Sequence, residues 1–207
     1  EKALQKLRFH KMILAYEFGK YELAWKLSQE LWSPRVEGPD VWVPYRYFYE
    51  GLIAFAEYQR SGKGKCLRRG QYVLKLMERW LQKGVVNCTH MRSLLYAEYL
   101  VAISARSVDD VRLAYDSAIC KAGRAGFMNT QALANERAGT YFVQSGDTWW
   151  ALTYLVRARD LYNDWGAIGK AEHISKTFCV ILEGDQSEST NFGSTDFHAR
   201  TRLDLIT

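Results

Sequence analysis

The segment from Ala114 to Ala171 constrains the fold of this chain most, because small residues recur in it at positions of helix contact. A glycine and two alanines would let two helices approach closely, while Phe142 and Leu155 fill the seam between them. The residues assigned to this packing are Gly139, Phe142, Gly146, Ala151, Leu155, Ala158, Trp165 and Gly166. The pattern predicts helix pairs that stack on one another along the chain.

Most of the remaining sequence also has helical periodicity, since apolar residues recur three and four positions apart. Pro is rare, with 3 residues, which suits long helices. Ser107 followed by Asp110 predicts a capping box at one helix start. The expected helices span residues 2–18, 21–32, 45–60, 67–83, 91–105, 108–122, 130–144 and 148–165, with a last one reaching 182.

These elements define the expected fold class. It is all-α, a right-handed superhelical array of tetratricopeptide-like (TPR-like) helix hairpins, an α-solenoid of about nine helices. Residues 1–184 would form this repeat domain. Residues 185–207 are polar, rich in Ser and Thr and without apolar periodicity, and they predict a flexible linker. Gly19 and Ala24 repeat the offset of Gly146 and Ala151, so the first hairpin resembles a degenerate copy of the later one.

Charge and cysteine content narrow the class of protein. The net charge is +5, and the excess gathers in a Gly-punctuated connection at Arg60, Lys63, Lys65, Arg68 and Arg69. We interpret it as a solvated loop and helix start, with an acidic partner surface as the alternative. The 4 cysteines are scattered without a CxxC pair, which favours reduced thiols and a cytoplasmic location. We expect no membrane span, and Glu1 in place of Met suggests an excised fragment.

The sequence offers no constellation for catalysis, so we expect no enzyme active site, no metal and no cofactor. Gly62–Cys66 and Gly166–Ala171 lack the spacing and hydroxyl of a phosphate loop. Cys88 and His90 are adjacent but supply only two metal ligands. The alternative is that Asn87 and His90 cap a helix start through side-chain hydrogen bonds.

Two groups of aromatic residues are candidates for partner binding. The candidate groove comprises Tyr45, Tyr47, Phe48, Tyr49, Arg92 and Tyr96, although core packing is the favoured interpretation for most of the aromatics. Trp149 and Trp150 are consecutive and point about 100° apart on a helix. At most one of them can lie in the helix seam, so packing is favoured over a ligand platform.

Motifs spread over most of the chain resemble one known helical region. They are Tyr47–Leu52, Met77–Trp80, Asn87, His90, Ala97-Glu98, Ala114-Tyr115, Ala118-Ile119, Gly126-Phe127, Ala132–Ala134, Glu136, Tyr162, Trp165–Ala167 and Lys170. The region they resemble is the TPR-like segment of large multidomain signalling proteins. In those proteins it lies between a predicted STAND-type ATPase module and a GAF sensor domain. A serine/threonine-kinase-like module often comes first and a hybrid histidine kinase or another output domain last.

The C-terminal residues add to this resemblance, and two segments depart from it. Leu203-Asp204-Leu205 looks like the start of the segment that leads into the GAF domain, which would make residues 185–202 the linker. Ala105-Arg106-Ser107 and Cys88-Thr89 depart from the residues common in the family. The family's ATP-binding and phospho-acceptor residues lie outside this segment, so none is assigned here.

The resemblance implies a non-catalytic regulatory segment that couples an upstream ATPase-like switch to downstream sensor and kinase domains. Its partners would be neighbouring domains of the same chain or a signalling protein. A free-standing TPR-like adaptor for a protein or peptide is the alternative. The third hypothesis is a basic repeat that binds nucleic acid, which rests on the net charge alone and is disfavoured. Membrane binding is not expected, and self-association stays open.

Overall fold

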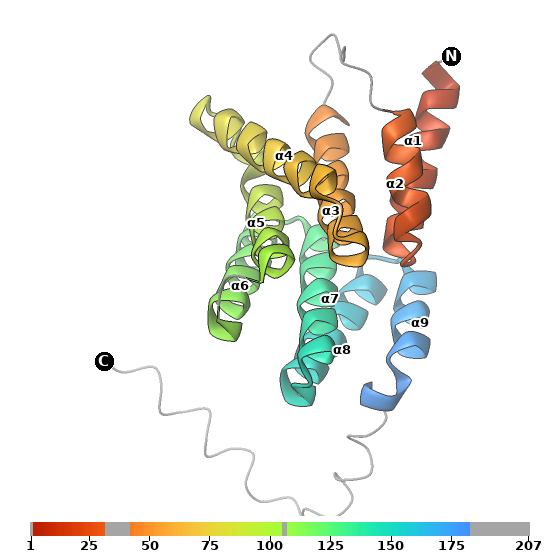
Figure 1. The fold of residues 1–207 in the computed structure, drawn as a ribbon. Helices are drawn as coiled ribbons and strands as arrows, with labels where there is room; N and C mark the ends of the chain where they lie inside the picture. The colour runs from red at the N-terminus through yellow and green to blue at the C-terminus, as the bar shows by residue number, and fades with distance from the viewer. Residues whose placement is uncertain (1, 32–41, 105–106, 183–207) are drawn as a thin grey trace, which may run out of the picture.

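The computed structural model describes residues 2–31, 42–104 and 107–182 of the chain (Figure 1). These residues form nine α-helices and one short 3-10 helix, with no strand among them. The predicted all-α array of helix pairs is therefore confirmed, while its superhelical handedness stays a prediction. The α-helices are α1 (Lys2–Glu17), α2 (Tyr21–Glu30), α3 (Trp42–Ser61), α4 (Gly64–Gln82), α5 (Thr89–Ile103), α6 (Val108–Arg124), α7 (Met128–Ser145), α8 (Thr148–Asp164) and α9 (Ile168–Thr177), and η1 (Val86–Cys88) precedes α5.

The helices pack mainly with their neighbours in sequence. Four hairpins follow one another, α1 with α2, α3 with α4, α5 with α6 and α7 with α8, and α9 packs on α8. Between hairpins, α2 contacts α3, α5 contacts both α3 and α4, and α6 contacts α7. One continuous apolar core runs through the first eight helices, and a smaller cluster lies between α7, α8 and α9.

The array curves so that its first and last helices come together. Figure 1 shows α9 directly below the lower ends of α1 and α2, although these elements stand at opposite ends of the described chain. α4 crosses obliquely in front of α3, and its far end projects beyond the array. No helix in the described ranges is long and apolar enough to cross a membrane.

Turn chemistry explains why the α7–α8 hairpin forms where it does. Gly146 adopts φ +80°, which a side chain would disfavour, and Asp147 N–H then donates to the Phe142 carbonyl at 3.0 Å. Asp147 also caps α8, because its carboxylate accepts from Trp150 N–H at 3.0 Å. Ser107 caps α6, accepting from Asp110 N–H at 3.2 Å, which is one of the two hydrogen bonds of the predicted capping box.

Two glycines inside helices lie at close contacts between the helices of a hairpin. A Cβ added to Gly139 of α7 would lie 2.7 Å from Leu155 Cγ of α8. One added to Gly70 of α4 would lie 2.4 Å from the Phe55 ring of α3. Each glycine therefore sets how near the two helices of its hairpin can approach.

Three predicted helix boundaries need correction, and one of them is the start of α4, which lies at Gly64 and not at Leu67. α3 begins at Trp42 and not at Tyr45, since Pro44 is tolerated in the first turn of a helix. The last helix does not run unbroken to residue 182, because α9 ends at Thr177 and Phe178 leaves the helical conformation. The predicted linker, residues 185–207, lies outside the described residues.

Candidate functional site

The aromatic residues of the candidate groove on α3 are divided between two sides of that helix. Phe48 and Tyr49 are buried in the core. Tyr45 packs against both, with ring centroids 6.2 and 5.3 Å away, and its hydroxyl lies 2.5 Å from Asn129 Nδ2 of α7. Tyr47 instead meets Trp80 of α4, edge to face at 5.6 Å. Successive residues of a helix diverge by about 100°, so these side chains form no single groove.

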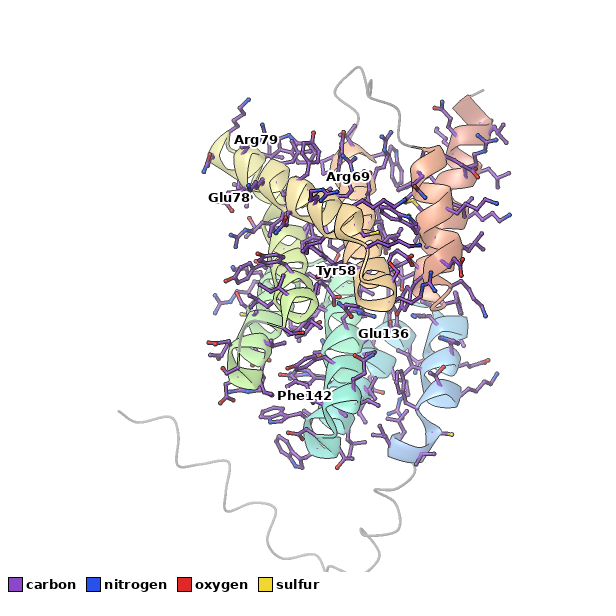
Figure 2. The ribbon with its side chains drawn as sticks, viewed as in Figure 1. Tyr58, Arg69, Glu78, Arg79, Glu136 and Phe142 are labelled. Atoms are coloured by element: carbon purple, nitrogen blue, oxygen red, sulfur yellow. The ribbon has the colours of Figure 1, made fainter. Side chains whose placement is uncertain are left out.

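Arg92 and Tyr96, the other two candidate groove residues, form a separate group on α5. The Arg92 guanidinium lies 5.2 Å from the Tyr96 ring centroid and 2.8 Å from a Glu78 carboxylate oxygen of α4. Beside them, a cavity of about 390 Å³ opens between α5 and α6, with Lys121 and Asp110 in its walls. Figure 2 shows Glu78 and Arg79 near the projecting end of α4.

The residues assigned to repeat packing lie almost entirely in the α7–α8 seam. Gly139, Phe142, Ala151, Leu155 and Ala158 are all buried. Gly146 and Gly166 occupy left-handed turns. Trp165 is the exception, since its side chain is 53% exposed at the end of α8, where the backbone turns away. It does not pack in the seam.

The two consecutive tryptophans of α8 differ in environment. Trp150 is half buried, stacks on Tyr154, and has the Arg112 guanidinium 4.8 Å from its ring centroid. Trp149 is 65% exposed and meets Trp150 edge to face. The prediction that at most one of the two would lie in the seam is confirmed.

Two of the five residues of the basic cluster are neutralised within the fold. Arg69 is buried on α4, with Nε 2.7 Å from Glu50 Oε1 of α3 and its guanidinium 4.8 Å from the Tyr72 ring centroid. Figure 2 shows Arg69 where α4 crosses α3. Arg60 pairs with Glu57 at 2.9 Å. Lys63, Lys65 and Arg68 remain exposed at the start of α4.

His90 does not cap α5, so this sequence-based alternative is wrong. The helix start at Cys88 has no capping side chain. His90 is instead buried, stacked on Phe127 with ring centroids 4.0 Å apart, and its Nε2 has no partner among the described residues. Burial lowers the pKa of His90 to about 4.

The most concentrated buried charge in the described chain lies where α1 meets α9. Lys170 of α9 points its Nζ at Glu136 Oε1 of α7, 2.7 Å away, and at Glu17 Oε2 of α1, 3.8 Å away. It also donates to the backbone carbonyl of Glu17, the last residue of α1. The three side chains are 7–14% exposed. We call this cluster, with Tyr49 and Tyr162, the ionic junction.

Two tyrosines complete the ionic junction from α3 and α8. Tyr49 donates to Glu17 Oε1 at 2.6 Å. The Tyr162 hydroxyl lies between the carboxylates, 2.9 Å from Glu136 Oε2 and 3.4 Å from Glu17 Oε2. Burial raises the pKa of Glu17, and the neighbouring Glu136 carboxylate adds to this rise, while Lys170 and both tyrosines oppose it. Figure 2 places Glu136 at the level where α1 and α2 end above α9.

A second buried network begins at the next residue of α7. Arg137 forms a bidentate pair with Glu98 of α5, at 2.9 and 3.1 Å, and Glu98 is fully buried. Tyr115 of α6 donates to Glu98 Oε1 at 2.8 Å. Arg137 Nη1 donates to the Tyr21 hydroxyl of α2 at 2.8 Å. We call this set the central network.

The two networks together connect most of the array. The ionic junction joins α1, α3, α7, α8 and α9, and the central network joins α2, α5, α6 and α7. Because both meet on α7, a shift of that helix must rearrange buried charges at both. A buried ion pair tolerates little separation, since an unpaired charge in a low-dielectric interior is costly. A displacement of one helix in either network can therefore be passed through α7 to the helices of the other network.

Candidate metal ligands and one further cavity complete the description of residues 2–31, 42–104 and 107–182. No group of three or more His, Cys, Asp or Glu residues is placed to hold a metal ion in these ranges. A cavity of about 510 Å³ opens where α3, α5 and α7 end, and its side chains are uncharged, among them Tyr58, Tyr141 and Gln144.

The sequence interpretation missed the ionic junction and the central network. A signal was present, because Glu136 stands four residues after Ala132 and three before Gly139, on the face that is buried. Charges at core positions of a periodic helix indicate buried pairs, but periodicity does not identify their partners.

The chain matches no family model, no curated protein and no solved structure.

Proposed function

We propose that the chain is a non-catalytic regulatory helical array of a larger signalling protein. The array would couple an upstream ATPase-like switch to downstream sensor and kinase domains, and it would itself supply no catalytic residue. The observation that carries the proposal is the contact of Lys170 with Glu17 and Glu136. This contact connects the end of α1 with α9, which are the first and last helices of the described array.

The physical argument concerns how motion passes through such a fold. In a straight solenoid each unit contacts only its neighbours, so its ends move independently. Here α1 and α9 share one buried ion cluster, and the central network holds the helices between them. A partner that displaces either end therefore shifts the population of arrangements of the whole array.

The resemblance to signalling proteins supports the same proposal. Four of the junction's five residues, Tyr49, Glu136, Tyr162 and Lys170, belong to the motifs that carry that resemblance. So do Glu98 and Tyr115 of the central network. The residue types that resemble the family are thus those that hold the curved array together.

Hydrogen exchange tests the coupling directly. In Lys170→Met, we expect faster amide exchange in the last turn of α1 as well as in α9, because both lose the same buried partner. Lys176→Met is the matched control, since Lys176 lies on α9 with its side chain 79% exposed. Faster exchange confined to α9 would refute coupling of the ends.

The sequence of the parent transcript on both sides of this chain separates the proposal from its alternative. An ATPase module upstream and a sensor with a kinase downstream would support an internal regulatory segment. A start codon just before Glu1 and a stop codon soon after Thr207 would leave a free-standing adaptor for a protein or peptide.

A further inference from the structure

α1 has a second apolar face, on which three leucines are more than half exposed. Leu4, Leu7 and Leu14 are 51%, 65% and 57% exposed. They stand three and seven residues apart, so they lie along one face of the helix. Phe18, four residues further on and 37% exposed, extends the line past the helix end, where its ring also contacts His173 and Lys170 of α9. We call these four residues the α1 stripe.

The α1 stripe is unusual for the outermost helix of an array. The opposite face of α1 already supplies the core, through buried Phe9, Met12 and Tyr16. Terminal helices of solenoids normally present a polar outer face, which keeps the array soluble. Single exposed leucines are common on protein surfaces, but several aligned on one face of a helix mark an interaction surface.

Charge around the α1 stripe indicates what would cover it. Lys11 lies within the stripe, four residues after Leu7 and three before Leu14, and is exposed. Lys6, Arg8 and His10 are exposed nearby on the same helix. The only carboxylate of α1 is Glu17, which is engaged in the ionic junction. The face is therefore both apolar and cationic.

A second copy of this chain fits the surface poorly. Lys11 is the central position of the line Leu4, Leu7, Lys11, Leu14 and Phe18, so a symmetric antiparallel pair places Lys11 opposite itself. A symmetric parallel pair does the same. Two like charges at the centre of an apolar contact oppose association.

We propose that the α1 stripe docks an acidic amphipathic helix of a partner protein. Apolar residues of that helix would cover the leucines, and a carboxylate facing Lys11 would pair with it, with a further carboxylate near Arg8. Helices recognise one another in this way through apolar anchors three, four and seven residues apart. The inference rests on the proposed function as an interaction array and names the chemistry of its partner.

The first test uses a synthetic amphipathic peptide of three heptads, about 21 residues, with Leu at the a and d positions. In the acidic peptide, Glu replaces the Leu at the central a position and occupies every e and g position. In the control peptide, each of these Glu residues is replaced by Lys. In fluorescence anisotropy we expect the chain to bind the acidic peptide and not the lysine peptide. Leu7→Ser/Leu14→Ser should weaken binding roughly tenfold or more.

Matched variants separate the stripe from general surface effects. Leu113→Ser on α6, at a side chain as exposed as Leu14, should leave binding unchanged. Lys11→Glu should reverse the preference, so that the lysine peptide binds and the acidic one does not. All of these positions are exposed, and circular dichroism verifies that each variant remains folded.

Three results would overturn the inference. One is equal binding of both peptides, or binding that Leu7→Ser/Leu14→Ser leaves intact. Another is a wild-type dimer in sedimentation that becomes monomeric in that variant, which would assign the stripe to a second copy. The third is stripe-dependent binding to phosphatidylserine vesicles without peptide binding. The hydrogen-exchange experiment on Lys170→Met involves no peptide, so it tests the proposed function independently of whether the α1 stripe binds a helix.

Discussion

Glu136 and Arg137 follow one another on α7 and form buried ion pairs with different helices. Glu136 Oε1 lies 2.7 Å from Lys170 Nζ of α9, and Arg137 Nε lies 2.9 Å from Glu98 Oε1 of α5. Successive side chains on a helix diverge by about 100°, so one turn of α7 can serve two neighbouring interfaces. α7 is therefore the shared element of the ionic junction and the central network.

Removing the ammonium group of the ionic junction should destabilise the whole array. In Lys170→Met, two carboxylates remain buried side by side without a counter-charge, and breaking a buried pair in this way costs about 3–5 kcal/mol. We expect a loss near 3 kcal/mol in chemical denaturation, since Glu17, whose pKa is already raised, can take up a proton. Adding Glu136→Gln should recover part of that loss.

The control for this change is on the same helix. Lys176 pairs with Glu172 at 3.5 Å in solvent, so Lys176→Met should alter the free energy of unfolding by less than about 0.5 kcal/mol. Equal effects of the two variants would contradict the structural assignment of Lys170.

The raised pKa of Glu17 predicts how junction stability depends on pH. Above its ordinary value of 4.5, the folded state retains a proton that the unfolded chain has lost. The contribution of Glu17 to the free energy of unfolding therefore falls as pH rises from 4.5 through the folded pKa. Glu17→Gln lacks this contribution, so its stability relative to the wild type should increase over that window.

Denaturation of both proteins at a series of pH values measures this difference. Titrating groups remote from Glu17 are common to both proteins and cancel in the comparison. Glu22→Gln on α2 serves as control, since the Glu22 side chain is 81% exposed. A difference between Glu17→Gln and wild type that stays constant with pH would show that burial does not raise the Glu17 pKa.

Much of the fold could be predicted from the sequence, because helical periodicity and turn glycines are local signals. The α7–α8 hairpin was accessible in this way, since Gly146 and Asp147 determine its turn and cap. The curvature that brings Lys170 to Glu17 could not be predicted from the sequence. It depends on contacts 153 residues apart, which no local pattern records. For the aromatics of α3, core packing was the favoured interpretation, and Phe48 and Tyr49 are indeed buried.

His90 should make the protein sensitive to acid. Its ring is buried against Phe127, and its pKa falls to about 4 from the ordinary 6.5. Between these values the unfolded chain binds a proton that the folded state excludes, so the contribution of His90 to the free energy of unfolding falls as pH decreases. The loss from this residue should approach about 3 kcal/mol at pH 4.

His90→Phe keeps an aromatic ring on Phe127 and removes the titrating nitrogens. We expect the free energy of unfolding of this variant to decrease less than that of the wild type as pH falls from 6.5 to 4. His10→Phe, at an exposed position on α1, should retain the wild-type dependence. Parallel pH profiles of His90→Phe and the wild type would contradict the buried neutral histidine.

Two glycines in helices give opposite predictions for the same substitution. At Gly139 an added methyl would lie 2.7 Å from Leu155 Cγ and 3.3 Å from its backbone nitrogen, so α7 and α8 must separate. We expect Gly139→Ala to cost about 1–3 kcal/mol by overpacking. At Gly169 of α9 nothing lies within 4 Å, and Gly169→Ala should stabilise the chain by up to about 1 kcal/mol through helix propensity.

A double-mutant comparison identifies the clash at Gly139 as the cause. Leu155→Ala removes the obstructing side chain, so it should cost less in the Gly139→Ala background than in the wild type. The recovery should be partial, because the backbone nitrogen of Leu155 still restrains the approach of the two helices. Additive losses in thermal or chemical denaturation would mean that Gly139 does not set the spacing of α7 and α8.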